Sequence, residues 1–151
     1  MARLWKRVLL RLGLIALLVA TGCSSIITVD VTGGWVGTLT WTDGPAANIT
    51  YPLSFDLTQE DKDLSGRVTL TSHGTETYTI DITQGRAHGS SVEFTASGVN
   101  DKVPTPVDVV FVFDGTADSD TLSGTGTAEI GGDLYEFTWA VTLVAPPPAE
   151  S

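Results

Sequence analysis

The stretch that decides the fold is residues 49–58, ITYPLSFDLT, in which every second side chain is apolar. An alternation of period two is typical of a β-strand with one buried and one wet face. The same alternation recurs at 78–83, 92–97 and 135–143. Between residues 33 and 145, no stretch repeats apolar residues at helical spacing. This region is therefore predicted to be all-β.

Turn-forming residues divide the region into eight predicted strands. Clusters of Gly, Pro, Asp and Ser separate the alternating runs, and short turns between successive strands make antiparallel hairpins. Pro52 lacks an N–H, so it is expected at an edge, a bulge or a strand end. The expected strands are 33–42, 47–59, 62–73, 75–87, 91–99, 105–116, 120–130 and 132–144.

Eight strands with one apolar face each must bury those faces together. Closing the sheet removes its two edges and leaves an interior that side chains or one small ligand can fill. The predicted fold is an eight-stranded antiparallel up-and-down barrel, with a two-sheet β-sandwich as the alternative. Gly66, Gly124 and Gly126 also face inward, where glycine permits bending or leaves space. The expected inner set is Trp35, Leu39, Trp41, Tyr51, Phe55, Tyr78, Phe94, Phe111, Phe113, Tyr135, Phe137 and Trp139.

The segment 33–38, GGWVGT, resembles the Gly-x-Trp opening strand of lipocalins and avidin-like proteins. In those families the tryptophan closes one end of an eight-stranded barrel. The Leu-Ser-Gly segments at 64–66 and 122–124 resemble strand starts of small bacterial relatives of that kind. The chain departs from the lipocalin pattern because no Lys or Arg follows Lys102 and no late helix is found. No biotin-binding constellation matches, so the resemblance implies an architecture and no particular ligand.

The first 22 residues have the composition of a cleaved export signal. Four basic residues lie within the first eleven, and the apolar run 12–20 is short for a bilayer core of about 30 Å. The segment 18–23, LVATGC, resembles a bacterial lipobox. This resemblance implies cleavage before Cys23 and lipid on its thiol. Ser24 follows where an inner-membrane retention signal has Asp, which by resemblance to enteric sorting favours the outer membrane.

Cys23 is the only cysteine, so it cannot form an internal disulfide. Acylation explains a lone cysteine in an exported protein, and firm anchoring needs more than one acyl chain. The chain is therefore expected to comprise a signal peptide 1–22, a lipidated tether 23–32, a barrel domain 33–145 and a Pro-rich tail 146–151.

The charge of the chain excludes two classes of partner. Without the signal, four basic residues remain against 18 acidic ones, which gives a net charge of −14. Nucleic-acid affinity depends on Lys and Arg neutralising phosphate, so no nucleic-acid partner is expected. Lying flat on anionic lipid is disfavoured for the same reason.

The sequence contains no recognisable catalytic or metal-binding arrangement. His73 and His88 lie beside glycines at expected turns, and there is no Gly-x-Ser-x-Gly elbow. The acidic turns within 60–63 and 114–120 do not match a calcium-binding loop. We expect neither an enzyme nor a metal or other cofactor.

The aromatic side chains leave two functions open. They either pack as a core or line a cavity for a small apolar ligand. The alternative function is an envelope module with a packed barrel that meets another protein through its rim or outer face. A ligand requires an open end, whereas an interaction module should expose apolar side chains at its loops. The candidate ligand-binding residues are Trp35, Trp41, Tyr51, Phe55, Tyr78, Phe94, Phe111, Tyr135 and Trp139.

Overall fold

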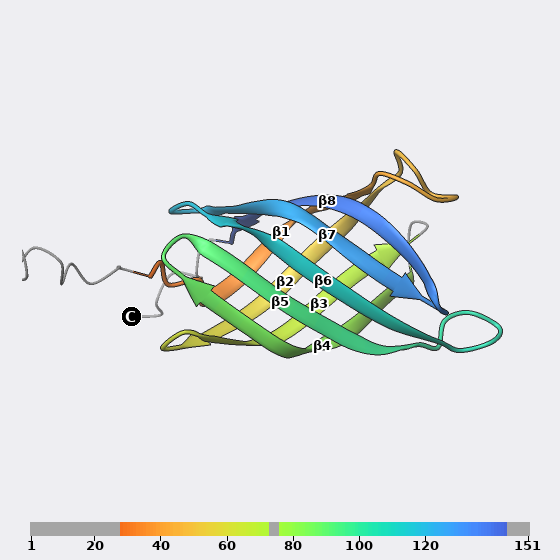
Figure 1. Cartoon of the computed structure of the whole chain (residues 1–151), viewed down its shortest axis with the longest axis horizontal. Coiled ribbons are helices and arrows are strands. Elements are labelled where there is room, and N and C mark those ends of the chain that lie inside the picture. Colours follow the sequence, from red (N-terminus) through yellow and green to blue (C-terminus); the bar gives the residue numbers. More distant parts are fainter. Residues whose placement is uncertain (1–27, 73–75, 145–151) are drawn as a thin grey trace, which may run out of the picture.

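The computed structural model describes residues 28–72 and 76–144, which form a closed antiparallel barrel (Figure 1). Each strand pairs with the next along the chain, and β8 returns to pair with β1. The predicted up-and-down barrel is confirmed, and the β-sandwich alternative is wrong. The strands are β1 (Gly33–Trp41), β2 (Thr50–Glu60), β3 (Asp63–Ser72), β4 (Glu76–His88), β5 (Ser91–Asn100), β6 (Val107–Ala117), β7 (Thr121–Ile130) and β8 (Asp133–Leu143).

The observed strand ends lie within three residues of the predicted ones. Pro52 is the third residue of β2. It directly precedes Leu53, the residue at which the ladder between β2 and β3 ends. Pro52 pairs with Thr38 on β1 but lies past the ladder with β3, so it is at an edge that is open on one side, where a missing N–H is tolerated. Residues 1–27 and 145–151 lie outside the described residues, as does His73. The predicted signal peptide, Cys23 and the tail therefore fall there. Across the described residues, no helix is long and apolar enough to cross a membrane.

The barrel is apolar inside and polar outside, as the period-two pattern predicts. Ile49 departs from the pattern: it precedes β2 and is 43% exposed. On the outer face, threonine hydroxyls pair between strands, 2.8 Å apart for Thr40 and Thr50. Every residue of the expected inner set is buried or partly buried. The buried members are Trp35, Leu39, Trp41, Phe55, Phe94, Phe111, Phe113, Phe137 and Trp139, and the partly buried ones are Tyr51, Tyr78 and Tyr135.

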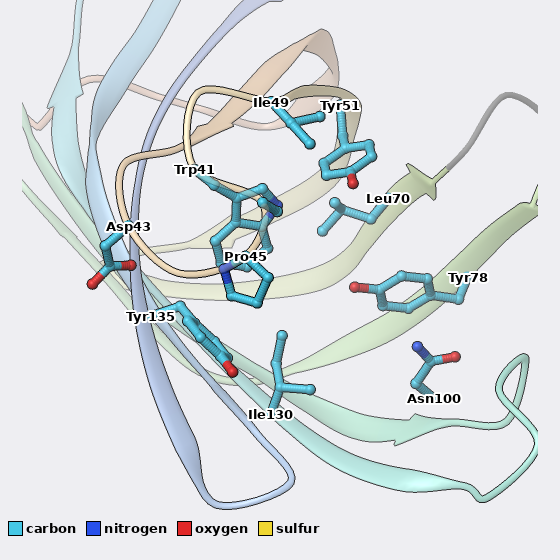
Figure 2. A pocket seen from close by; sticks show the side chains of 11 residues that line it. Trp41, Asp43, Pro45, Ile49, Tyr51, Leu70, Tyr78, Asn100, Ile130 and Tyr135 are labelled. Carbon is cyan, nitrogen blue, oxygen red and sulfur yellow. The ribbon is translucent and has the colours of Figure 1, made fainter.

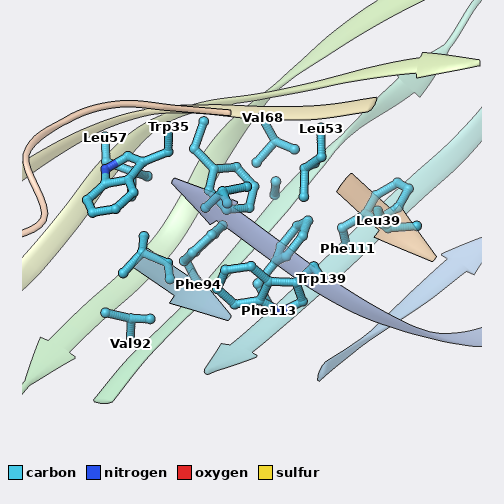
Figure 3. Close-up of a cluster of buried hydrophobic side chains, with 14 of the residues drawn as sticks. Trp35, Leu39, Leu53, Leu57, Val68, Val92, Phe94, Phe111, Phe113 and Trp139 are labelled. Carbon is cyan, nitrogen blue, oxygen red and sulfur yellow. The ribbon is translucent and has the colours of Figure 1, made fainter. Parts of the chain in front are cut away.

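Aromatic rings fill the middle of the barrel. The Phe113 ring lies 4.9 Å from Phe94 and 5.2 Å from Phe137, measured between ring centroids. Phe55 meets Phe113 and Trp139 edge-on at 5.1 and 5.5 Å. Figure 3 shows the rings of Phe94, Phe113 and Trp139 gathered across the interior. Phe94 and Phe113 are stacked, the other pairs are edge-on, and both arrangements are common in packed cores, so this part of the barrel is a packed core.

The inward glycines play the two roles expected of them. Gly66 has φ of +132°, and a Cβ there would collide with the carbonyl oxygen of Asp56 on β2. This glycine therefore lets β3 bend closely against its neighbour. At Gly126, a Cβ would collide with the ring of Phe137, so the space that glycine leaves is occupied by an aromatic side chain.

A β-bulge in β4 reverses the inward phase of that strand. Ile82 pairs with Ala96 and Gln84 pairs with Thr95, so β4 has one more residue than β5 at this point. The ladder with β3 shifts by one residue in the same region. Before the bulge, even-numbered side chains such as Ile82 face inward, and after it Ala87 is buried. An extra residue in one strand produces this phase change.

Residues 28–32 close the end of the barrel at which the described chain begins, and we call them the plug. Val31 is fully buried, its carbonyl oxygen accepts a hydrogen bond of 2.9 Å from the Trp35 indole, and its N–H donates to Gln59. The N–H of Val29 donates to Gly89 at 3.0 Å. The plug was expected to belong to the tether, but its contacts make it part of the barrel.

Candidate functional site: an apolar cup at the open end

The opposite end of the barrel is hollowed by a cup of about 390 Å³. It lies at the end of the barrel that carries the loops 42–49 and 101–106 and the turn 131–132, and its lining comes from all strands except β6. In Figure 1 this is the end opposite the plug. Figure 2 shows the side chains around the cup. Its lining is Trp41, Asp43, Pro45, Ala46, Ile49, Tyr51, Leu70, Tyr78, Asn100, Ile130 and Tyr135.

The two ends of the barrel differ in loop length and in what covers them. At the plug end, β2–β3 and β4–β5 are joined by two-residue turns, 61–62 and 89–90. At the cup end, β1 and β2 are joined by 42–49, and β5 and β6 by 101–106. At the plug end the buried Val31 fills the opening, whereas at the cup end the loop 42–49 forms part of the rim and contributes Pro45 and Ala46 to the lining. The cup is therefore a product of the fold, in a place where small barrels can hold ligands.

The loop 42–49 is a structured wall of the cup. The carboxylate of Asp43 accepts a hydrogen bond of 2.7 Å from the N–H of Glu136, and the N–H of Thr42 donates to the carbonyl of the same glutamate. Gly44 has φ of +75°, and a Cβ there would lie 2.5 Å from the ring of Tyr135. Glycine at this position lets the loop pass directly over that ring.

Two phenol groups contribute polar atoms to the lining of the cup. The hydroxyl groups of Tyr51 and Tyr78 are directed into the cup in Figure 2. Burial, with a smaller contribution from the neighbouring Tyr51 phenol, raises the pKa of Tyr78 to about 12. The Tyr78 phenol is therefore neutral at physiological pH and can donate or accept a hydrogen bond. An apolar lining with a few directed polar groups is the usual composition of a small-molecule site.

We expect the Tyr78 phenol to ionise near pH 12 in the folded protein, well above the ordinary tyrosine pKa of 10.0. The folded pKa is raised, so the stability linked to this group is fully present below pH 10. It is lost as the pH rises through about 12. Phenolate absorbance near 295 nm measures the ionisation (from roughly pH 8 to 13), and Tyr78→Phe should remove the latest step. Loss of a step near pH 10 in that variant would contradict the burial of this phenol.

The nine candidate ligand-binding residues separate into two groups. Four line the cup, and five lie in the packed core below it. Because the five core residues are 3% exposed or less, a ligand in the cup would not reach most of their surface. The cup group is Trp41, Tyr51, Tyr78 and Tyr135. The core group is Trp35, Phe55, Phe94, Phe111 and Trp139.

Sequence reasoning missed several residues of the cup. Leu70 and Ile130 are inward residues near the ends of β3 and β7, and Asn100 ends β5. An up-and-down order places alternate loops at the same end of a barrel. Extending the period-two pattern to the last residue of each strand could therefore have found this row. Pro45 and Ala46 carry no such signal because they belong to an irregular loop.

Other hollows lie on the outer wall and are lined mainly by polar side chains. One involves Gln84, Arg86 and Glu93, and another involves Asp114 and Glu136. Within residues 28–72 and 76–144, no three His, Cys, Asp or Glu side chains are grouped so that they could hold a metal ion. His88 is exposed at the end of β4, on the plug side and away from the cup.

Fold and site together define an up-and-down barrel with a plugged end, a packed middle and an apolar cup. Comparison with protein-family models, with curated protein sequences and with solved structures gave no match. The residues of the cup are therefore the basis for inferring a function.

Proposed function

We propose that this protein is a non-catalytic lipoprotein of the cell envelope that binds a small apolar ligand in its cup. The observation that carries the proposal is the contrast between a filled core and one apolar hollow of about 390 Å³. That volume is within the roughly 300–1,000 Å³ usual for small-molecule sites. The export signal and the lipobox resemblance support attachment through lipid on Cys23, with the outer membrane favoured over the inner.

An interaction module is the second candidate, supported by apolar side chains at the cup end. Among the described residues, four of the seven exposed large hydrophobic side chains lie there, so this end is the more apolar surface of the described barrel. In this alternative the barrel is a scaffold, and its loops meet another envelope protein. The four residues are Ile49, Val99, Val103 and Leu134.

Ligand binding predicts that filling the cup abolishes uptake. Ala46→Trp should place an indole in the cup, whereas Ala140→Trp makes the same change on the exposed outer face of β8. The mature chain with Cys23→Ser, exported in its own host behind a non-lipoprotein signal, stays free of lipid and detergent. Native mass spectrometry of this chain should show a reproducible small added mass, which Ala140→Trp keeps and Ala46→Trp loses.

A bare mass in all three proteins, with no uptake of added apolar compounds, would contradict the ligand proposal. It would favour the interaction module, whose partner should then be sought by crosslinking from Leu134 in intact cells. An added mass that survives in Ala46→Trp would place the ligand elsewhere on the chain.

Lipid attachment predicts that Cys23→Ser releases the protein from the membrane fraction. The wild-type protein should partition into detergent and carry the mass of a diacylated cysteine at residue 23. The variant should lose both properties, because burial of several acyl chains is what makes the anchor firm. The added mass on the N-terminal peptide is the decisive measurement. An unmodified Cys23 in protein from the native host would overturn this part of the proposal.

A further inference from the structure

Aromatic rings surround the cup on several sides. Trp41 comes from β1, Tyr51 from β2, Tyr78 from β4 and Tyr135 from β8. The rings of Trp41 and Tyr135 meet edge-on at 6.2 Å between centroids. The face of an aromatic ring carries partial negative charge, and a cation within about 6 Å of its centroid is attracted to it. Several such rings around one hollow are a known means of recognising ammonium groups.

The charged side chains at this end of the barrel, like the aromatic rings, favour a cationic ligand. Asp43 lines the cup, and among its described lining residues there is no Lys, Arg or His. Lys102 is the only basic residue described near the rim, and it lies 3.9 Å from a carboxylate oxygen of Asp101. Carboxylates gathered around a cleft raise the local concentration of cations and repel anions. The acidic residues described at this end are Asp43, Glu76, Asp101, Asp108, Glu129, Asp133 and Glu136.

We propose that the ligand of the cup is an apolar molecule with a positive charge, an amine or a quaternary ammonium. This inference rests on the proposed function and specifies its ligand class. The ammonium group lies near the rim, beside the aromatic rings, and the apolar part contacts Leu70 and Ile130. Asp43, whose carboxylate accepts a hydrogen bond from the Glu136 N–H, attracts the positive charge from the wall of the cup. A carboxylate or phosphate in the same place would meet aromatic faces and acidic side chains, with no basic side chain in the described lining to pair with.

The test compares three compounds that share a ten-carbon chain and differ in charge: decyltrimethylammonium, decanol and decanoate. Each is titrated calorimetrically, below its micelle concentration, into the mature chain carrying Cys23→Ser. The ammonium compound should bind about tenfold more tightly than decanol and more tightly still than decanoate. The preference over decanol should persist in part at 1 M salt, where screening acts over about 3 Å and only short-range contacts with the rings remain.

Two matched pairs of variants assign the preference to the cup. Tyr51→Phe keeps the ring and should keep the preference for the ammonium compound, whereas Tyr51→Leu should reduce it about fivefold. Asp43→Asn keeps an oxygen to accept from the Glu136 N–H but removes a charge, so it should weaken ammonium binding. Asp114→Asn makes the same charge change outside the cup lining, and it should leave ammonium binding unchanged. Unfolding curves verify that each variant is folded.

The possible failures are distinguishable. If none of the three compounds binds, the proposed function itself fails. If decanol or decanoate binds as tightly as the ammonium compound, the cup binds apolar ligands but the inference about charge is overturned. Equal effects of Tyr51→Phe and Tyr51→Leu, or of Asp43→Asn and Asp114→Asn, would also overturn it.

Discussion

Replacing Phe113 with alanine should lower the free energy of unfolding by about 3–5 kcal/mol, a large part of the total for a domain of this size. Phe113 is fully buried and its ring contacts five others. Deleting it removes apolar surface and leaves a cavity that rings held by a closed barrel cannot fill. The five neighbouring rings are Phe55, Phe94, Phe111, Phe137 and Trp139.

Urea denaturation followed by tryptophan fluorescence measures this loss. Val112→Ala is the matched control, since Val112 adjoins Phe113 on β6 but points outward and is 39% exposed. The control should lose less than about 1 kcal/mol. Similar losses for the two variants would show that the interior is not packed as described. A loss below about 1 kcal/mol for Phe113→Ala would lead to the same conclusion.

Gly37→Ala should destabilise the barrel at the upper end of the roughly 1–3 kcal/mol range for overpacking, or beyond it. Gly37 lies inside β1, between Leu53 on β2 and Val141 on β8. A Cβ there would collide with the carbonyl oxygen of Ala140 and lie 2.7 Å from the Cα of Val141. These are backbone atoms of a paired strand, so relief requires the seam between β1 and β8 to move.

Gly34→Ala is the control for this prediction. Gly34 lies on the same strand, and no atom lies within 4 Å of the position its Cβ would take. The free energy of unfolding of Gly34→Ala should differ from the wild-type value by less than about 1 kcal/mol. The difference can be a gain in stability, because alanine restricts the unfolded chain. Hydrogen exchange should show that Gly37→Ala weakens protection along the β1–β8 ladder. Equal stability of the two variants would mean that the seam is looser than described.

The barrel could be predicted from the sequence because its strands have one wet and one buried face. In β2 and β8 the alternation is nearly unbroken, so it identifies both the strand and its inward side chains. The bulge in β4 is different: an extra residue reverses the phase, and the pattern around Ile82 does not show where. Bulges depend on pairing with both neighbouring strands, which a single run of sequence does not contain.

The plug and the cup could be predicted less well because they depend on contacts between distant segments. Val31 lies just before the first strand, and hydrogen bonds with Gln59 and Trp35 hold its backbone over the end of the barrel. The aromatic residues of the cup were expected to face inward, but the sequence alone did not separate them from the core. That separation depends on the plug at one end and on the loop 42–49 at the other, and neither can be placed before the strand order is known.

The position of the plug has a consequence for the proposed lipid anchor on Cys23. Cys23 precedes Thr28 by five residues, and an extended chain spans at most about 3.6 Å per residue. An anchor on Cys23 would therefore keep the plug within about 18 Å of the lipid. The cup would then face away from the bilayer, because the plug and the cup lie at opposite ends of the barrel. A ligand of the cup would then arrive from the aqueous phase or from a protein bound over the cup, and not directly from the leaflet that holds the acyl chains.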